Sequence, residues 1–180
     1  DAVYLPMPIA AGPTPRDNDA SLKATLTELI AYGPLDFGGC SVTIPHKESL
    51  VRVASELGWE IDAGAAIIGA ANTLVVSREH GRARVRVLNS DAHAAIESIK
   101  GEMGPRELAG LTIGVVGAGG AGRAIAFGAS RAGATPIVFN RDRARAEELA
   151  ASVRATTGVA AQGLAWDAMA EAACDVWVNC

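Results

Sequence analysis

The 180-residue sequence predicts an α/β fold in two parts: an N-terminal α/β domain, then part of a doubly wound, Rossmann-type parallel sheet. Three observations lead to this expectation. In the second half, apolar runs of strand length alternate with helical patterns, which is typical of parallel strands joined by crossover helices. A glycine-rich turn, Gly117 to Gly122, directly follows one of these runs and opens a helix. In the first half, helical patterns alternate with strands and a hairpin.

Helices and strands of the first half follow from the spacing of apolar residues. Leucine and isoleucine at helical spacing predict a helix over 20–31. The run "VTIP" predicts a strand that stops at Pro45, because proline cannot donate to a ladder. Helices are expected over 46–57 and 91–100, and the opening "DAVYLPMPIA" also has the composition of a strand.

A hairpin is predicted between the segment "IIGAANTLVVS" and the run "RARVRVLNS", with a turn at "REHG". Val85 and Val87 alternate there with Arg84 and Arg86, so one face of the strand is apolar and the other is basic. This alternation is typical of a strand that is buried on one side.

The second half follows a Gly- and Pro-containing connector, "KGEMGPRELAG". We therefore predict a domain boundary there, between an α/β domain over 1–103 and a nucleotide-fold half over 104–180. The expected strands of the second domain are "LTIGVVG", "TPIVFN", "GVAAQGLA" and "DVWVNC", and the segment "WDAMAEAAC" is expected to be helical. Because the chain opens and stops within strand-like runs, we expect it to be an internal piece of a longer protein.

Composition limits the classes of function. A net charge of −4 with 49% hydrophobic and 4% aromatic residues predicts a globular protein without a nucleic-acid-binding surface. No apolar run reaches the roughly 18 residues of a membrane span. The odd number of widely spaced cysteines, Cys40, Cys174 and Cys180, predicts neither disulfides nor a metal site and favours the cytoplasm. The expected partner is a small molecule.

The glycine turn predicts a dinucleotide site. Gly117 permits the tight turn, Gly119 lets the backbone approach a pyrophosphate, and Gly122 lets helix and strand pack closely. Gly120 and Ala121 complete the loop, whose N–H groups at a helix N-terminus attract a phosphate. The alternative is a glycine-rich turn without a ligand.

The next strand end indicates which dinucleotide binds. Asn140 and Arg141 stand where an NAD-binding sheet usually carries an acidic residue, and an arginine there suits the 2′-phosphate of NADP. Arg145 follows one helical turn later. Alternatively, these arginines are solvated helix charges. Asp142 counts against NADP, because a carboxylate repels a phosphate. NADP nevertheless stays the expected cofactor because of the arginines, and NAD is less favoured.

Five motifs in this order, "VTIPHK", "GAANTL", "NSD", "GAGGAGRA" and "NRDRARAEELA", resemble the shikimate dehydrogenase family. The resemblance implies an oxidoreductase that reversibly reduces 3-dehydroshikimate to shikimate with NADPH, a step of the shikimate pathway of aromatic amino acid biosynthesis. It also implies that 1–103 is a substrate-binding catalytic domain and 104–180 a dinucleotide-binding domain. Lys47 and Asp91 then correspond to a catalytic acid–base pair. Thr43 and Asn72 match residues that hold the substrate, and Asp91 also binds a substrate hydroxyl.

Each of these residues also has a structural interpretation. Lys47 reads as a surface lysine at a helix start, Asp91 as the N-cap of the helix that follows it, and Asn72 as a buried amide bonded to backbone. His46 is interpreted as a local hydrogen-bonding group and is not assigned a catalytic role.

The sequence departs from the family pattern in three places: Ser41 replaces the usual Asn, Ala92 replaces a glycine, and Asp142 replaces the usual Thr or Ser. The opening segment and "NSDAHAAIESI" resemble the dehydrogenase half of fused dehydroquinate dehydratase/shikimate dehydrogenases, which implies a fused dehydratase domain as partner. Two alternatives stay open: a quinate/shikimate dehydrogenase using NAD or NADP, and a nucleotide-binding module without turnover.

Overall fold

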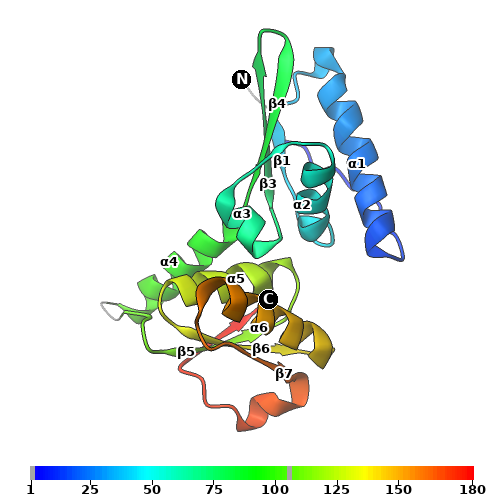
Figure 1. Cartoon of the computed structure of the whole chain (residues 1–180). Coiled ribbons are helices and arrows are strands. Elements are labelled where there is room, and N and C mark those ends of the chain that lie inside the picture. The colour runs from blue at the N-terminus through cyan, green and yellow to red at the C-terminus, as the bar shows by residue number, and fades with distance from the viewer. Residues whose placement is uncertain (1–2, 105–106) are drawn as a thin grey trace. The chain divides into compact units, whose positions relative to one another are not determined.

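Two compact units make up the computed structural model, which describes residues 3–104 and 107–180. The first unit comprises the residues up to Ala66 together with Ala70–Leu88, and the second comprises Ile67–Gly69 and Asn89–Cys180. In Figure 1 the first unit is coloured from blue to green and the second from green to red. Each unit contains its own four-stranded sheet. The predicted α/β fold class is confirmed.

The sheet of the first unit has the order β1-β3-β4-β2. Its central pair is the predicted hairpin, because β3 (Thr73–Glu79) and β4 (Arg82–Leu88) run antiparallel with Val76 opposite Val85. Val85 and Val87 are buried as the alternation predicts. The short edge strands, β1 (Gly39–Ser41) and β2 (Glu60–Ile61), pair antiparallel with β3 and parallel with β4 respectively.

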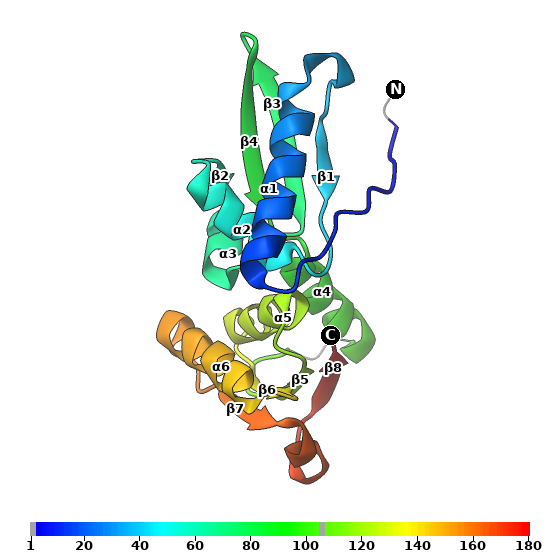
Figure 2. The same cartoon turned by 90° about the vertical axis from the view of Figure 1, so that its right-hand side faces the viewer.

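Helices α1 (Pro15–Ala31) and α2 (Lys47–Glu56) lie over one face of this sheet (Figure 2). α1 begins five residues earlier than predicted, because Thr14 and Asp17 form a reciprocal capping box around Pro15. A short helical turn (Gly33–Leu35) follows α1, and α3 (Ala63–Ile68) extends from the first unit into residues of the second. The core is formed by apolar residues of both helices and the hairpin, among them Leu22, Leu26, Leu50, Ala54, Leu74, Val76 and Val87.

Two strand predictions in this unit fail. Residues 3–14 form no helix or strand, and Asp1 and Ala2, also part of that prediction, lie outside the described residues. An extended run becomes a strand only when a neighbour pairs with its backbone groups, and no strand of this sheet does so. The run before Pro45 also leaves the sheet early, after Ser41, since the His46 N–H donates to Thr43 O (2.9 Å) and closes a turn.

The second unit has the parallel strand order β7-β6-β5-β8, which is the order 3-2-1-4 typical of a Rossmann sheet. Its elements, in chain order, are α4 (Asp91–Met103), β5 (Thr112–Val116), α5 (Gly120–Arg131), β6 (Thr135–Asn140), α6 (Arg143–Thr157), β7 (Gln162–Ala165), η2 (Trp166–Glu171) and β8 (Val176–Asn179). All four predicted strands are present. The segment "WDAMAEAAC", however, forms the 3₁₀ helix η2 rather than an α-helix, and no side chain caps its first turn.

α4 packs against α5 within the second unit. A Cβ at Gly128 would lie 2.9 Å from Ile96 Cγ1, so the two helices approach closely at this glycine. The two compact units therefore divide between Leu88 and Asn89, whereas the predicted boundary falls after Met103, at the end of α4. The assignment of substrate and dinucleotide roles to the domains 1–103 and 104–180 stays a prediction.

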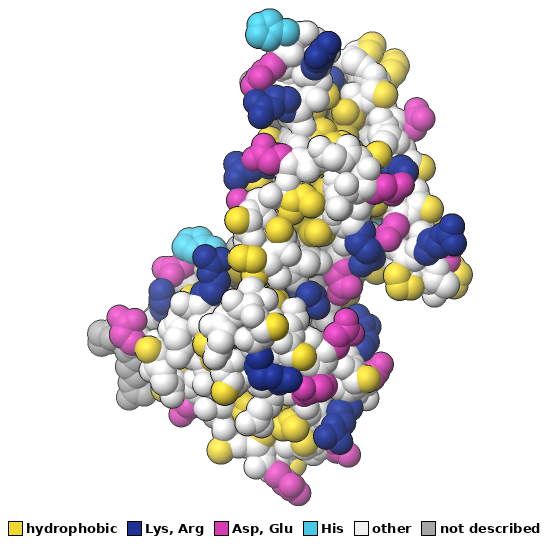
Figure 3. Space-filling view, in the orientation of Figure 1, with side chains coloured by type: hydrophobic (Ala, Val, Ile, Leu, Met, Phe, Trp, Pro, Cys, Tyr) yellow, Lys and Arg dark blue, Asp and Glu magenta, His cyan; other side chains and the backbone are white. Residues whose placement is uncertain are grey.

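Charged side chains of both signs are mixed on the face shown in Figure 3. On the hairpin, for example, Arg84 lies 3.4 Å from Glu79, and Arg86 lies 2.9 Å from Asp62. The basic face predicted for β4 is therefore balanced locally by carboxylates. Within the described residues, no helix combines the length and the apolar character that crossing a membrane requires.

Candidate active site

Three of the predicted site residues, Thr43, Lys47 and Asn72, are brought together in the first unit by backbone hydrogen bonds. The Val42 N–H donates to Asn72 O (2.7 Å), and the Ala71 N–H donates to Lys47 O (2.9 Å). The turn that precedes α2 is thereby joined at both of its ends to the segment that enters β3. Residues far apart in sequence thus share one small region.

The side-chain amide of Asn72 is oriented by its neighbour. Thr73 Oγ1 donates to Asn72 Oδ1 (2.9 Å), while the backbone N–H of Asn72 donates to Leu88 O (3.1 Å). Asn72 is half-buried rather than buried, and this contact of its amide is to a side-chain hydroxyl rather than to backbone, so the contact does not decide between the structural and the binding interpretation. This anchoring also holds the amide in one plane, as a binding residue requires.

His46, beside Lys47, is buried, with 6% of its surface exposed. Its Nε2 lies 3.3 Å from the carbonyl oxygen of Ile9, which can only accept, so Nε2 carries the proton. Among the described residues, no polar atom bonds to Nδ1. The predicted hydrogen-bonding role is therefore present, but its partner lies in a distant segment rather than in the local turn.

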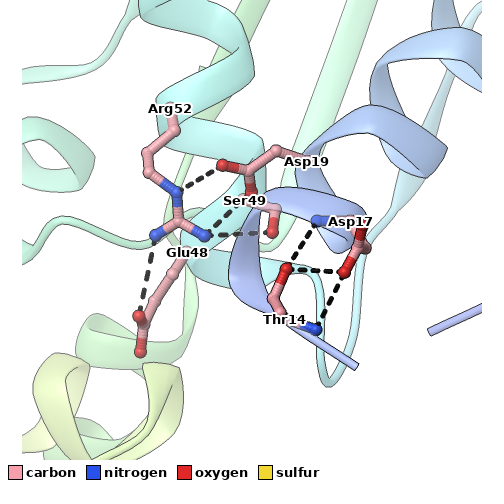
Figure 4. Close-up of polar contacts among 6 residues, drawn as sticks. All are labelled: Thr14, Asp17, Asp19, Glu48, Ser49 and Arg52. Atoms are coloured by element: carbon pink, nitrogen blue, oxygen red, sulfur yellow. Dashed lines mark hydrogen bonds and ion pairs between the residues drawn. The ribbon is translucent and has the colours of Figure 1, made fainter. Parts of the chain in front are cut away.

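Behind this turn, a charged cluster joins α1 to α2 (Figure 4). Arg52 donates through Nε and Nη2 to the two carboxylate oxygens of Asp19, each at 2.8 Å, and also to Ser49 Oγ at 3.2 Å. Glu48 lies 3.8 Å from the same guanidinium. The Arg52 hydrogen bond is the main reason why the pKa of Asp19 is lowered, and Asp19 in turn raises the pKa of Arg52. The cluster fixes the first turn of α2, where Lys47 lies.

Asp91, the predicted partner of Lys47, is the first residue of α4 in the second unit. The alternative interpretation of Asp91 as the helix cap is wrong. Asn89 supplies the cap, since its Oδ1 accepts from the N–H groups of Asp91 (2.9 Å) and Ala92 (3.3 Å). Lys47 and Asp91 belong to different units, so their pairing stays a prediction.

In the second unit, the glycine turn has the steric features that a phosphate-binding loop needs. Gly117 has a φ of 116°, a conformation that disfavours other residues. A Cβ at Gly122 would overlap the carbonyl oxygen of Gly117, so only glycine fits there. A Cβ at Gly119, in contrast, would meet no atom within 4 Å. The backbone at Gly119 therefore faces open space at the N-terminus of α5, where a phosphate is favoured.

The turn after β6 is held by its own side chains. Asn140 Nδ2 donates to Asp142 O (3.0 Å), and Asp142 Oδ1 accepts from the Ala144 N–H (2.9 Å) as the N-cap of α6. Asp142 thus fills the capping role for which Thr and Ser are also suited. Its negative charge is directed at a helix N-terminus, which offsets part of the repulsion expected for a phosphate.

Arg141 lies over an aromatic ring that the sequence reasoning missed. Its guanidinium carbon is 5.8 Å from the ring centre of Trp166, the first residue after β7. Arg145 lies on the first turns of α6, on the exposed surface. The signal that could have revealed Trp166 is the parallel pairing itself, because residues that directly follow neighbouring strands meet at one sheet edge.

These features fit a dinucleotide. The turn from Gly117 to Gly122 leaves backbone open to a phosphate, and the C-terminal edge of the parallel sheet carries arginines at the end of the second strand. In sheets of this topology, ligands bind outside the carboxyl ends of the strands. The described side chains therefore suit a dinucleotide with an additional phosphate.

Comparison with known proteins gives the family. Residues 5–74 match the family model of the shikimate dehydrogenase substrate binding domain. The shikimate dehydrogenase (NADP(+)) of Methanocella arvoryzae is 40% identical over 147 residues, which are 81% of this chain and 49% of that protein. This chain belongs to the shikimate dehydrogenase family. The resemblance stated from the sequence motifs is therefore confirmed.

Other shikimate dehydrogenase relatives extend the comparison. The bifunctional 3-dehydroquinate dehydratase/shikimate dehydrogenase of Arabidopsis thaliana is 36% identical over 136 residues, which are 69% of this chain and 22% of that protein. The structure of shikimate 5-dehydrogenase from Thermus thermophilus in complex with NADP(H) and shikimate has a TM-score of 0.65 and 32% identity. That likeness covers 89% of this chain and 52% of the other. The chain spans about half the length of the curated shikimate dehydrogenases that it matches.

Proposed function

We propose that this protein is an NADP-dependent shikimate dehydrogenase, which reversibly reduces 3-dehydroshikimate to shikimate. One observation carries the proposal. A unit that matches the substrate binding domain of this family is followed by a 3-2-1-4 parallel sheet with an open glycine at the start of its first crossover helix. A substrate-binding unit and a dinucleotide-binding unit in one chain are what a hydride-transfer enzyme needs.

Lys47 is the proposed proton donor and acceptor. When hydride reaches the carbonyl carbon, negative charge develops on the oxygen, and an ammonium group placed there donates a proton to it. In the reverse direction, the amine of Lys47 takes the proton from the substrate hydroxyl. Asp91 is the proposed partner, whose carboxylate orients the ammonium and accepts from a substrate hydroxyl.

Thr43 and Asn72 are the proposed substrate-binding residues. Both lie beside the backbone hydrogen bonds that tie the turn before α2 to the start of β3, and Thr73 holds the amide plane of Asn72. A hydroxyl and an amide both donate and accept, so together they suit a ring that carries several hydroxyl groups. Their fixed backbone lowers the entropy that binding costs.

NADPH, when bound, supplies the hydride. The loop residues Gly117, Gly119, Gly120, Ala121 and Gly122 are proposed to hold its pyrophosphate through backbone N–H groups at the N-terminus of α5.

Asn140, Arg141 and Arg145 are proposed to hold the 2′-phosphate. Arginine offers paired N–H donors that match a phosphate, and its planar group stacks on an adenine. NAD is the less favoured cofactor, because it lacks the group that these arginines would bind.

Steady-state kinetics tests the proposal. The protein is assayed for shikimate-dependent NADP⁺ reduction by the near-ultraviolet absorbance of NADPH, alongside Lys47→Ala and, as a matched surface control, Lys100→Ala. We expect Lys47→Ala to lower kcat by about 10² or more, since general acid–base catalysis contributes at least that much. Lys100→Ala is expected to retain normal turnover. A kcat within about threefold of wild type for Lys47→Ala would remove Lys47 from the reaction.

The same assay separates the alternatives. Preference for quinate with NAD would identify a quinate/shikimate dehydrogenase. NADP binding by calorimetry without any turnover would identify a nucleotide-binding module.

We also propose a cytoplasmic location and a fused dehydroquinate dehydratase domain as partner. The free cysteines Cys40, Cys174 and Cys180 support a reducing compartment. The Arabidopsis relative named as bifunctional supports the fusion. Subcellular fractionation and the mass of the native polypeptide test these two proposals.

A further inference from the structure

Arg141 and Trp166 are neighbours because of the strand register. β6 and β7 run parallel, and their last paired residues are Asn140 and Ala165. Arg141 and Trp166 each come one position later, at the carboxyl edge of the sheet where ligands of this topology bind. Their proximity is therefore built into the sheet.

The contact has the geometry of a cation–π interaction. The guanidinium carbon of Arg141 lies 5.8 Å from the centre of the Trp166 ring, within the roughly 6 Å over which such pairs attract. Tryptophan is the strongest aromatic partner for a cation. With 44% of its surface exposed, Trp166 is accessible from solvent rather than enclosed in a core.

Arginine has many rotamers, so an exposed guanidinium is ordinarily mobile and must be ordered when a phosphate binds. A guanidinium that already rests on a ring has lost part of that freedom before the ligand arrives. The ring occupies one face of the planar group and leaves its edge N–H groups for hydrogen bonds to an anion. Asn140, which bonds to Asp142 O (3.0 Å), fixes the backbone on which this arrangement stands.

We propose that Trp166 is a positioning residue for cofactor selectivity: it holds Arg141 in place for the 2′-phosphate and so favours NADP over NAD. This inference rests on the proposed function, because it takes the dinucleotide to be the ligand of this sheet edge. Trp166 acts through Arg141, and the phosphate contact belongs to Arg141 itself. NAD lacks the 2′-phosphate, so its binding does not depend on the orientation of Arg141.

Calorimetric titration with NADP⁺ and with NAD⁺ tests the inference without requiring turnover. Trp166→Ala is expected to weaken NADP⁺ binding about two- to fivefold, the range of an exposed cation–π contact, and to leave NAD⁺ binding unchanged. Trp166→Phe, which keeps an aromatic face, should restore most of the NADP⁺ affinity. In a protein that already carries Arg141→Ala, adding Trp166→Ala should cause no further loss of NADP⁺ affinity.

Each other outcome overturns the inference. An equal loss of affinity for both cofactors would mean that Trp166 merely supports the fold of η2, and unchanged NADP⁺ affinity would mean that the ring does not order Arg141. A wild type without any preference for NADP⁺ would show that Arg141 does not read the 2′-phosphate. The proposed reaction fails separately, when shikimate gives no turnover although the NADP⁺ preference and its dependence on Trp166 are intact.

Discussion

Substitution by alanine should have different effects at two glycines of the same loop, Gly119 and Gly122. Gly119 has φ −82° and ψ −170°, which alanine adopts readily, and its added Cβ would meet no atom within 4 Å. A Cβ at Gly122 would instead overlap the carbonyl oxygen of Gly117 and lie 2.9 Å from its carbon. Gly119→Ala is thus expected to weaken NADP⁺ binding, whereas Gly122→Ala is expected to lower the stability of the fold.

The magnitudes follow from opposing contributions. For Gly119→Ala, reduced freedom of the unfolded chain stabilises by about 0.4–1 kcal/mol. A poorer N-cap destabilises by about 0.5–1 kcal/mol. The Tm should therefore change by less than about 5 °C. For Gly122→Ala, overpacking against rigid backbone costs about 3 kcal/mol, of which better helix propensity offsets about 1 kcal/mol. A loss of about 2 kcal/mol lowers the Tm of a unit of this size by about 10 °C.

NADP⁺ titration and thermal melting, followed by tryptophan fluorescence, measure the two effects. We expect Gly119→Ala to weaken NADP⁺ binding roughly tenfold or more, because its methyl group lies where the phosphate approaches the backbone. The matched control is Gly101→Ala in α4, where an added Cβ also meets no atom within 4 Å. It should leave NADP⁺ affinity unchanged and should not lower the Tm. Normal NADP⁺ affinity of Gly119→Ala, or an unchanged Tm of Gly122→Ala, would refute the reasoning.

Two further predictions concern stability. Asp19→Asn should cost the first unit about 1 kcal/mol, a value reduced for solvent screening because 44% of the Arg52 side chain is exposed. Since Arg52 lowers the Asp19 pKa below 3.8, this contribution is present above that pH and is lost as the pH falls through the lowered pKa. Urea titrations at neutral and acidic pH measure it, and an equal effect of Asp19→Asn at both would contradict it. Asn89→Ala, which removes the cap of α4, should cost about 1 kcal/mol in the same titration. An unchanged free energy of unfolding for Asn89→Ala would mean that another group caps α4.

The elements that the sequence predicted well are those in which local pattern and tertiary environment agree. Val85 and Val87 alternate with arginine, and the structure buries them against α1 and α2 as the alternation requires. The glycine turn is equally predictable, because the demands on Gly117 and Gly122 come from the backbone alone. Such features need no knowledge of distant residues.

Two of the failures occur where a distant partner decides. The opening run has strand composition, yet residues 3–14 pair with no strand, and the Ile9 carbonyl meets the His46 ring instead. The alternative interpretation of Asp91 as the cap of α4 fails for a local reason, because Asn89, two residues earlier, accepts from the first N–H groups of the helix. Trp166 could not be found from spacing, since only the strand register brings it to Arg141.

Asp142 shows how one substitution in a family motif can be accommodated. The Thr or Ser usual at this position can cap α6 without charge, and aspartate caps it equally well through Oδ1. The carboxylate, however, adds a negative charge beside the proposed 2′-phosphate site. The N-terminal dipole of α6 offsets part of this charge, and Arg145 adds a cation on the same helix. In the proposed arrangement, Trp166 holds Arg141 in place and so helps to keep the affinity for a phosphate at the sheet edge where Asp142 adds a negative charge. The roles of Asp142 and Trp166 are therefore linked through Arg141.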